Sequence, residues 1–171
     1  SPTQVTLLTP SSEEETGLLP TFSWTASSDA DLYDEITYTI SYGLDVSMLN
    51  SVDVGSDLIY TPDNDLQDNT TYYWKVVATD LSGATTENAG GYHSFRVNTE
   101  NDLPSDFALL TPENTSMVTD LTPTLRWDIP TDADDRSRSI VSYHVYLDTN
   151  LTNVIPDTVT TNSYAPEVDL I

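Results

Sequence analysis

The chain has 171 residues, of which 28 are Asp or Glu and 5 are Lys or Arg, so its formal net charge at pH 7 is −23. Because this charge repels phosphate backbones and anionic lipids, we expect neither a nucleic-acid partner nor a membrane-surface one. No run of 18 apolar residues is present to insert into a bilayer, and the absence of cysteine excludes disulfides and thiolate metal sites.

An internal repeat divides the chain. Three pairs of segments match in the same order, at offsets of 102, 103 and 104 residues: 7–10 with 109–112, 20–24 with 123–127, and 60–62 with 164–166. Matches that keep their order while drifting by one residue indicate duplication. We therefore predict two domains, residues 1–99 and 104–171, joined by a linker at 100–103.

Within each copy apolar residues alternate with polar ones, which is the period of a β-strand. Pro, Asp, Asn and Gly interrupt these runs, and no stretch of ten residues has a helical period. In the first copy we predict seven strands, in chain order 4–9, 20–26, 35–43, 50–55, 58–61, 71–79 and 91–98. Seven short strands in about 100 residues favour an all-β sandwich of two antiparallel sheets.

Two features of the first copy resemble a fibronectin type III domain. Trp24 lies in the second predicted strand, where that family carries a core tryptophan, and "LQDNTTY" places Leu66 six residues before Tyr72. This spacing resembles the tyrosine corner, in which the phenol bonds back to the backbone. The resemblance implies two tandem fibronectin type III-like β-sandwiches, similar to the repeats of prokaryotic secreted or surface proteins.

The second copy stops before the counterpart of residues 68–98, so we expect its sandwich to lack the last two strands in this sequence. Such a sandwich exposes its core and leaves an open edge, and it should not be stable alone. Three explanations stay open: the chain continues, the sequence is a fragment, or another chain supplies the strands as in donor-strand assembly.

No pattern in the sequence points to catalysis. His93 and His144 fall in strand-like runs without a nucleophile or carboxylate at a motif spacing, and GxSxG, HExxH and glycine-rich phosphate loops are absent. We expect no enzymatic activity and no catalytic residue. Tyr33, Tyr73 and Tyr92 are the aromatic residues least explained by packing, and they leave carbohydrate open as a partner.

The topology of a type III sandwich predicts which acidic side chains come close together. It brings the linker and the start of the second domain together, and with them six candidate calcium ligands: Glu100, Asn101, Asp102, Asp132, Asp134 and Asp135. Calcium takes six to eight oxygen ligands, and the linker run before Pro104 resembles the acidic linker of cadherin-type repeats. Calcium at the domain junction is therefore one hypothesis, with solvated turn residues or a salt-adapted surface as the alternative.

Further acidic groups lie at both ends of the first domain. We expect Asp29, Asp31 and Asp34 to form the equivalent cluster at its start, joined by Asp57 or Asp80. Loops at its exit end carry Glu13, Glu14, Glu15, Asp63, Asp65 and Asp68.

Tandem, cysteine-free and acidic type III-like repeats favour an extracellular or cell-surface structural or adhesive module, such as a spacer or a surface-layer or fibre component. We expect its partners to be other protein chains or further repeats of the same protein. The alternatives are accessory domains of a secreted polysaccharide-degrading enzyme and a self-assembling subunit completed by a neighbour's strands. Sequons at Asn69, Asn114 and Asn150 are candidates for glycosylation.

Overall fold

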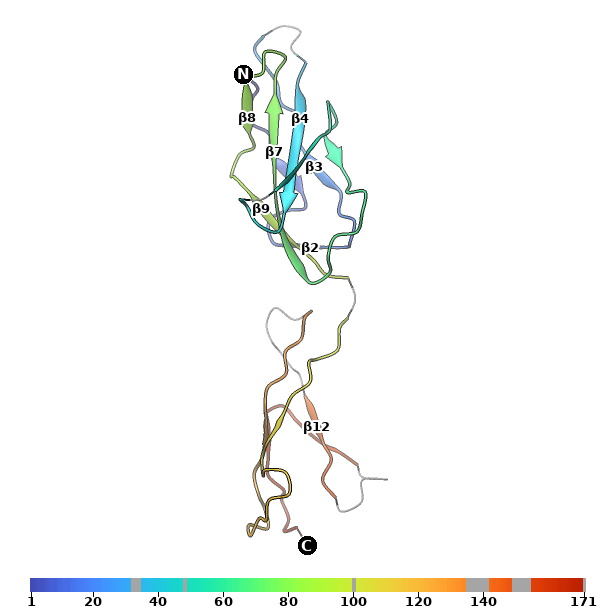
Figure 1. Cartoon of the computed structure of the whole chain (residues 1–171), viewed down its shortest axis with the longest axis vertical. Coiled ribbons are helices and arrows are strands. Elements are labelled where there is room, and N and C mark those ends of the chain that lie inside the picture. The colour runs from blue at the N-terminus through green and yellow to red at the C-terminus, as the bar shows by residue number, and fades with distance from the viewer. Residues whose placement is uncertain (32–34, 48, 100, 135–141, 149–154, 171) are drawn as a thin grey trace. The chain divides into compact units, whose positions relative to one another are not determined.

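The computed structural model describes residues 1–31, 35–47, 49–99, 101–134, 142–148 and 155–170 (Figure 1). The described residues form strands and no helix, so the chain is all-β as predicted, and they contain no helix that could cross a membrane. They separate into two compact units, Ser1–Glu100 and Asn101–Ile171.

Unit 1 is a sandwich of two sheets. Its strands are β1 (Leu7–Thr9), β2 (Glu14–Thr16), β3 (Phe22–Trp24), β4 (Thr37–Gly43), β5 (Asn50–Asp53), β6 (Ile59–Tyr60), β7 (Thr70–Thr79), β8 (Thr85–Glu87) and β9 (His93–Val97). One sheet has the order β1-β3-β6, and the other has the order β2-β9-β7-β4-β5 with β8 paired to β7. Figure 1 labels β2, β9, β7, β4 and β8 of the second sheet. All pairs are antiparallel except β2 with β9.

The core of unit 1 follows from the alternation in the sequence. In β7 the side chains of Tyr72, Trp74, Val76 and Ala78 point inward and are buried, while the residues between them are half-buried. Phe22 of the facing sheet packs against Trp74, with ring centroids 5.1 Å apart. The Trp74 indole also donates a hydrogen bond across the sandwich to the Pro10 carbonyl, at 3.2 Å. Burying one such large apolar side chain stabilises a fold by about 1.5–3 kcal/mol.

All seven strands predicted for the first copy are present, several of them shorter than expected. Two strands were not predicted. β8 pairs with the end of β7, and β2 pairs in parallel with β9. The expectation that Glu14 and Glu15 lie in a loop is wrong, because their backbone extends the sheet at its edge.

The tyrosine corner is confirmed. The backbone amide of Gln67 donates to the hydroxyl of Tyr72 at 3.0 Å, one residue from the predicted anchor at Leu66. The side chain of Leu66 packs against the core, and its amide donates to the Leu18 carbonyl at 2.9 Å. Together with the strand order, this corner gives unit 1 a fibronectin type III- or immunoglobulin-like fold.

Unit 2 repeats part of this plan. Its strands are β10 (Leu109–Thr111), β11 (Leu125–Trp127), β12 (Tyr143–Val145), β13 (Asp157–Val159) and β14 (Ser163–Tyr164). The sheet β10-β11-β14 corresponds to β1-β3-β6, and the pair β12-β13 corresponds to β4-β5. The ring contact between Trp127 and Tyr143, at 5.2 Å, matches that between Trp24 and Tyr38, at 6.0 Å. In the described part of unit 2, no strand lies on β12 as β7 lies on β4.

Candidate functional sites

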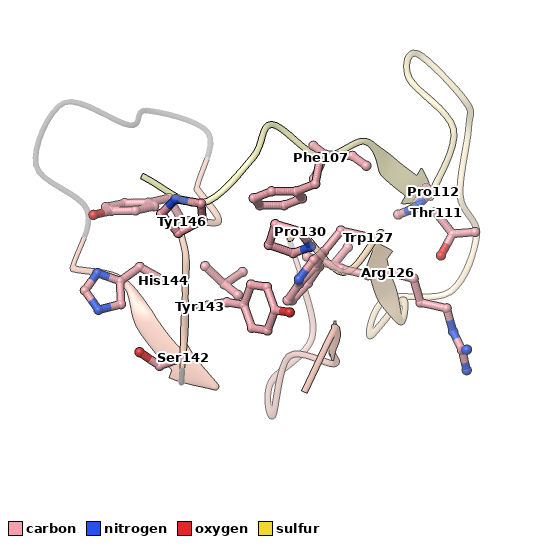
Figure 2. A pocket seen from close by; sticks show the side chains of 14 residues that line it. Phe107, Thr111, Pro112, Arg126, Trp127, Pro130, Ser142, Tyr143, His144 and Tyr146 are labelled. Carbon is pink, nitrogen blue, oxygen red and sulfur yellow. The ribbon is translucent and has the colours of Figure 1, made fainter. Parts of the chain in front are cut away.

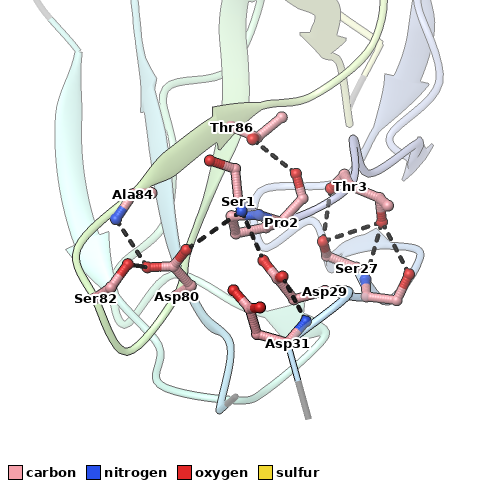
Figure 3. Close-up of polar contacts among 11 residues, drawn as sticks. Ser1, Pro2, Thr3, Ser27, Asp29, Asp31, Asp80, Ser82, Ala84 and Thr86 are labelled. Atoms are coloured by element: carbon pink, nitrogen blue, oxygen red, sulfur yellow. Dashed lines mark hydrogen bonds and ion pairs between the residues drawn. The ribbon is translucent and has the colours of Figure 1, made fainter.

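The start of unit 1 holds a cation between two buried carboxylates. The α-ammonium nitrogen of Ser1 lies 3.1 Å from Oδ2 of Asp29 and 3.7 Å from Oδ2 of Asp80, and both aspartate side chains are only 2% exposed (Figure 3). Of the two residues expected to join Asp29 there, it is Asp80 that meets this ammonium group. Asp31 lies beside them, and Asp34 falls outside the described residues.

Hydrogen bonds keep these carboxylates ionised. The backbone amide of Asp31 and then the Ser1 ammonium lower the pKa of Asp29 below its usual 3.8. The hydroxyl of Ser82, with help from the amide of Ala84, lowers the pKa of Asp80. In turn the hydrogen bond to Asp29 raises the pKa of the Ser1 ammonium above 8.0.

A set of short polar contacts fixes the first residues of unit 1 against the loop after β3. The amide of Thr3 donates to the Ser28 carbonyl at 2.8 Å, and the hydroxyl of Ser27 donates to the Thr3 carbonyl at 2.6 Å. On the other side, the Thr86 hydroxyl donates to the Pro2 carbonyl at 2.8 Å. The ammonium group is therefore held in place by its neighbours as well as by charge.

Unit 2 begins in the same way. The amide of Ser105 donates to the Thr131 carbonyl at 2.7 Å, as Thr3 does to Ser28. The amide of Asp102 donates to Oδ2 of Asp134, and the amide of Asp134 donates to Oδ1 of Asp132 at 3.0 Å.

Four of the six calcium candidates are described, and three of them meet here: Asp102, Asp132 and Asp134. The side-chain amide of Asn101 instead donates to the Asp102 carbonyl at 2.9 Å. Glu100 and Asp135 lie outside the described residues. Oδ1 of Asp134 is buried without a hydrogen-bond partner. Across the described residues, no three or more His, Cys, Asp or Glu side chains already converge as a metal site would require.

At the exit end of unit 1, Asp68 has a structural partner that the sequence did not indicate. Its Oδ1 accepts the amide of Thr99 at 3.0 Å and its Oδ2 accepts the Thr99 hydroxyl at 3.0 Å. The same carboxylate accepts the amide of Asn69 at 2.9 Å. Asp68 therefore ties the loop before β7 to the end of β9.

The other candidates from the sequence are placed as follows. His93 is half-buried in β9 with its ring edge-on to Trp74, and His144 is exposed in β12. Tyr92 is partly exposed and carries the Lys75 ammonium 5.3 Å from its ring centre, while Tyr33 lies outside the described residues.

Of the three sequons, the described residues include two. The Asn69 side chain accepts a hydrogen bond from Arg96 at 3.3 Å, whereas Asn114 is exposed. Asn150 lies outside the described residues.

A hollow of about 470 Å³ lies at the end of unit 1, where the sheets part. Tyr42 and Tyr60 form one wall, their hydroxyls 3.5 Å apart, and Asp63 and Asp65 lie at its rim. Burial, followed by the bond to Tyr60, raises the pKa of Tyr42. The strand-like spacing of these tyrosines did not indicate the hollow.

Unit 2 contains an apolar groove of about 470 Å³ between its two sheets. Phe107, Trp127 and Tyr143 turn toward one another in it, with Leu109, Leu125 and Val145 also in the lining, whereas Arg126 points away (Figure 2). The groove agrees with the expectation that the second copy exposes its core.

No protein-family model matches the chain, and no curated protein sequence matches it. Among solved structures, the FN1–FN3 domains of chicken CNTN1 match at a TM-score of 0.42 and 14% identity, over 99% of this chain and 56% of that one. An α-L-rhamnosidase from Dictyoglumus thermophilum matches at a TM-score of 0.42 and 14% identity, over 67% of this chain and 15% of that one.

The Streptomyces avermitilis α-L-rhamnosidase, complexed with L-rhamnose, matches at a TM-score of 0.39 and 13% identity, over 69% of this chain and 13% of that one. The chain thus spans between 13% and 56% of the length of these three chains. The fold assignment rests on the strand order and the tyrosine corner described above.

Proposed function

We propose that the chain is a non-catalytic structural or adhesive module, displayed outside the cell, that works through type III-like sandwiches repeated in tandem. One observation carries the proposal: the structure builds the same start of a sandwich twice. β1 and β10 pair with β3 and β11 in the same register, Leu7 opposite Trp24 and Leu109 opposite Trp127. The duplicated features are the pairing of these strands and the hydrogen bond that fixes the residues before the first strand, from Thr3 to Ser28 in unit 1 and from Ser105 to Thr131 in unit 2.

The surface chemistry supports an extracellular place for such a module. A chain with 28 acidic residues and a single lysine, Lys75, stays soluble and repels nucleic acid. Partners in this reading are other protein chains or further repeats of the same protein, as in the surface layers and fibres of prokaryotes. The exposed sequon at Asn114 is open to glycosylation.

The test is to replace residues 1–171 in the parent gene by an unrelated pair of type III domains of equal length. A spacer contributes length and stiffness, so the replacement should leave surface display and attachment of intact cells unchanged. Loss of attachment with surface display retained would assign the adhesive role, whereas loss of an enzymatic activity after the exchange would contradict the proposal. Antibodies that label the chain only in permeabilised cells would contradict its extracellular place.

We also propose that calcium is a cofactor that stiffens this module. Its ligands would come from the six candidates named in the sequence analysis. Two observations support it. Oδ1 of Asp134 is buried without a hydrogen-bond partner, and the carboxylate of Asp132 lies beside it, accepting the Asp134 amide at 3.0 Å. Calcium would neutralise the carboxylates and hold the residues before β10 against the loop after β11.

Isothermal titration of the full chain with calcium chloride tests this role. Extracellular calcium modules bind with Kd values of roughly 10⁻⁴–10⁻³ M, and the double variant Asp132→Asn, Asp134→Asn should bind at least ~10-fold more weakly because it removes two of the anionic ligands. Asp169→Asn, on an exposed carboxylate, is the matched control and should titrate like the parent. Equal binding by the double variant and the control rules this site out.

The hollow beside Tyr42 and Tyr60 favours a second candidate function, an accessory domain of a secreted polysaccharide-degrading enzyme. Aromatic rings beside carboxylates and amides are a common lining for sugar sites, since rings stack on sugar faces while oxygens bind hydroxyls. Binding of the chain to plant or microbial polysaccharides, abolished by Tyr60→Ala, would favour this candidate. A hydrolase domain in the parent gene would favour it independently.

A further inference from the structure

Unit 1 holds an aromatic wall beside the hollow described above. The ring centroids of Tyr42 and Tyr60 lie 5.9 Å apart, and the buried ring of Phe22 supports both, at 5.4 Å and 6.3 Å. Tyr72 also lines the hollow and is only 6% exposed, with its hydroxyl fixed by the amide of Gln67. Because packing already holds these rings, a ligand would not have to order them on binding.

The formal charge of the lining is entirely negative. Its carboxylates belong to Asp45, Asp63 and Asp65, and none of the described residues that line the hollow is Lys, Arg or His. Asp63 and Asp65 are exposed and have no hydrogen bond or ion pair with another described residue. The amide and the hydroxyl of Ser47 donate to Oδ1 of Asp45 at 2.8 Å and 2.7 Å, which lowers the pKa of that carboxyl and keeps it ionised. The hollow therefore attracts a cation.

The arrangement of these carboxylates does not suit a metal ion. Across the described residues, no three His, Cys, Asp or Glu side chains converge closely enough to hold one. The volume of about 470 Å³ is also much larger than an ion needs, and it falls in the range of roughly 300–1,000 Å³ that ligand pockets occupy. An organic cation, whose charge is spread over several atoms, fits both observations.

Unit 1 already contains the matching arrangement elsewhere, with its own cation. The Lys75 ammonium lies 5.3 Å from the ring centre of Tyr92 and 2.7 Å from Oε1 of Glu87. The negative face of the ring attracts the cation, and the neighbouring carboxylate adds a charge-assisted hydrogen bond. Among the described residues, the hollow has the rings and the carboxylates of this arrangement but no cation.

We propose that the hollow of unit 1 binds the guanidinium group of an arginine side chain from a partner protein, stacked on the tyrosine wall and paired with Asp63 and Asp65. A guanidinium is planar, so it can lie on a ring while its N–H donors reach two carboxylates. A lysine ammonium is a more strongly hydrated point charge, and a neutral sugar would leave the carboxylates without a counter-charge. The inference deepens the adhesive role proposed above and rests on that role for the partner being a protein.

Titration of the full chain with the peptide acetyl-Gly-Arg-Gly-amide, followed by backbone amide NMR, tests the site. Saturable shifts should appear at residues 43–45, 50 and 63–66, which line the hollow. A matched peptide with citrulline in place of arginine keeps the planar side chain and lacks the charge. It should bind at least ~5-fold more weakly, because the ion pairs and the cation–π attraction are lost. Equal binding of the two peptides would overturn the proposal.

A matched pair of double variants locates the binding. Asp63→Asn with Asp65→Asn removes the charge at the rim and should weaken binding of the arginine peptide by ~5-fold or more. Its control, Asp57→Asn with Asp169→Asn, removes the same charge from exposed positions outside the lining and should bind like the parent. Equal weakening by the two double variants would show diffuse attraction to an acidic chain and overturn the proposal.

The aromatic wall is tested at Tyr60. Tyr60→Phe keeps the ring and should bind the arginine peptide like the parent, whereas Tyr60→Leu should bind ~3-fold or more weakly because the cation–π attraction of this ring is lost. The amide spectrum of unit 1 checks that both variants keep the fold. Equal binding by the two folded variants would show that this ring is not part of the site and overturn the proposal.

Two further probes separate the competing ligands. Equal binding of acetyl-Gly-Lys-Gly-amide would contradict recognition of a guanidinium. Binding of neutral cellohexaose at the same amides, without binding of the arginine peptide, would overturn the proposal and assign the hollow to the second candidate function.

The replacement of residues 1–171 in the parent gene tests the module separately from this site. Loss of attachment after that replacement, with no arginine binding in the titration, would keep the adhesive role and overturn the arginine site. Arginine binding that meets all the controls, with attachment unchanged after the replacement, would support the site and show that it does not serve adhesion.

Discussion

At the scale of the residue, single polar groups fix the loops of unit 1 at both ends. Tyr72 is buried, and its hydroxyl accepts the amide of Gln67, so one side chain joins the core to the loop before β7. Asp68 joins the same loop to Thr99. At the opposite end Asp29 and Asp80 hold the Ser1 ammonium.

Replacing Tyr72 with Phe removes the acceptor of the corner and leaves the Gln67 amide without it. We expect the free energy of unfolding of unit 1 to fall by about 0.5–1.5 kcal/mol, since that is the net contribution of a typical intramolecular hydrogen bond. Urea denaturation measures it. The control Tyr73→Phe, on the outward side of β7, should stay within about 0.5 kcal/mol of the parent; equal losses for both would contradict the role of the corner.

The Asp29 cluster predicts a pH window. The folded pKa of Asp29 lies below 3.8, so its stabilisation is present above that pH and is lost as the pH falls through the lowered value.

We therefore expect Asp29→Asn to lower the melting temperature of the chain most above pH 3.8, with a smaller effect as the pH falls below that value. Thermal melts across this range, beside the exposed control Asp57→Asn, give the comparison. A loss that does not vary with pH would mean that Asp29 acts without its charge.

At the scale of the element, β7 organises unit 1, because β4, β8 and β9 all pair with it. Alternation of inward and outward residues, over ten residues in β7 and seven in β4, made both strands predictable from the sequence. β2 and β8 contain only Glu and Thr and have no inward apolar side chain. They can therefore be recognised as strands only from their pairing with β9 and β7. The sequence likewise carries no local sign that Asp68 meets Thr99 or that Ser1 meets Asp29, since both contacts depend on the finished fold.

Asn88 makes buried hydrogen bonds that the sequence did not predict. It is buried at the end of β8, where its Oδ1 accepts the Val76 amide at 2.9 Å and its Nδ2 donates to the Gly91 carbonyl at 2.6 Å. These bonds complete the edge of β7 beyond the last paired residue of β8.

Asn88→Ala leaves the buried amide of Val76 and the carbonyl of Gly91 without these partners. The expected loss is about 1–3 kcal/mol in the free energy of unfolding, because the Val76 amide stays buried without its acceptor. Chemical denaturation should separate it from Asn64→Ala, an exposed control expected within about 0.5 kcal/mol of the parent. A loss as small as the control's would show that water replaces the side chain at no cost.

At the scale of the whole molecule, unit 2 repeats part of the strand arrangement of unit 1. The core of unit 1 is buried between its two sheets, whereas the described part of unit 2 has an apolar groove between its sheets. The repeat itself and the all-β class were visible in the sequence, because they depend on residue order and period. Of the calcium candidates, the structure brings Asp102, Asp132 and Asp134 together without completing a metal site among the described residues. The groove of unit 2 and its lining required the structure.

The most direct test of this account is residue-resolved hydrogen exchange of the unmodified chain. If unit 2 is the sandwich of unit 1 without its strand pair, the amides of Ile40 and Tyr42 in β4 should exchange ~100-fold or more slowly than those of Tyr143 and Val145 in β12, because only β4 lies inside a closed cooperative unit. Equal protection in β4 and β12 would show that unit 2 closes its core without added strands, and the account would be wrong.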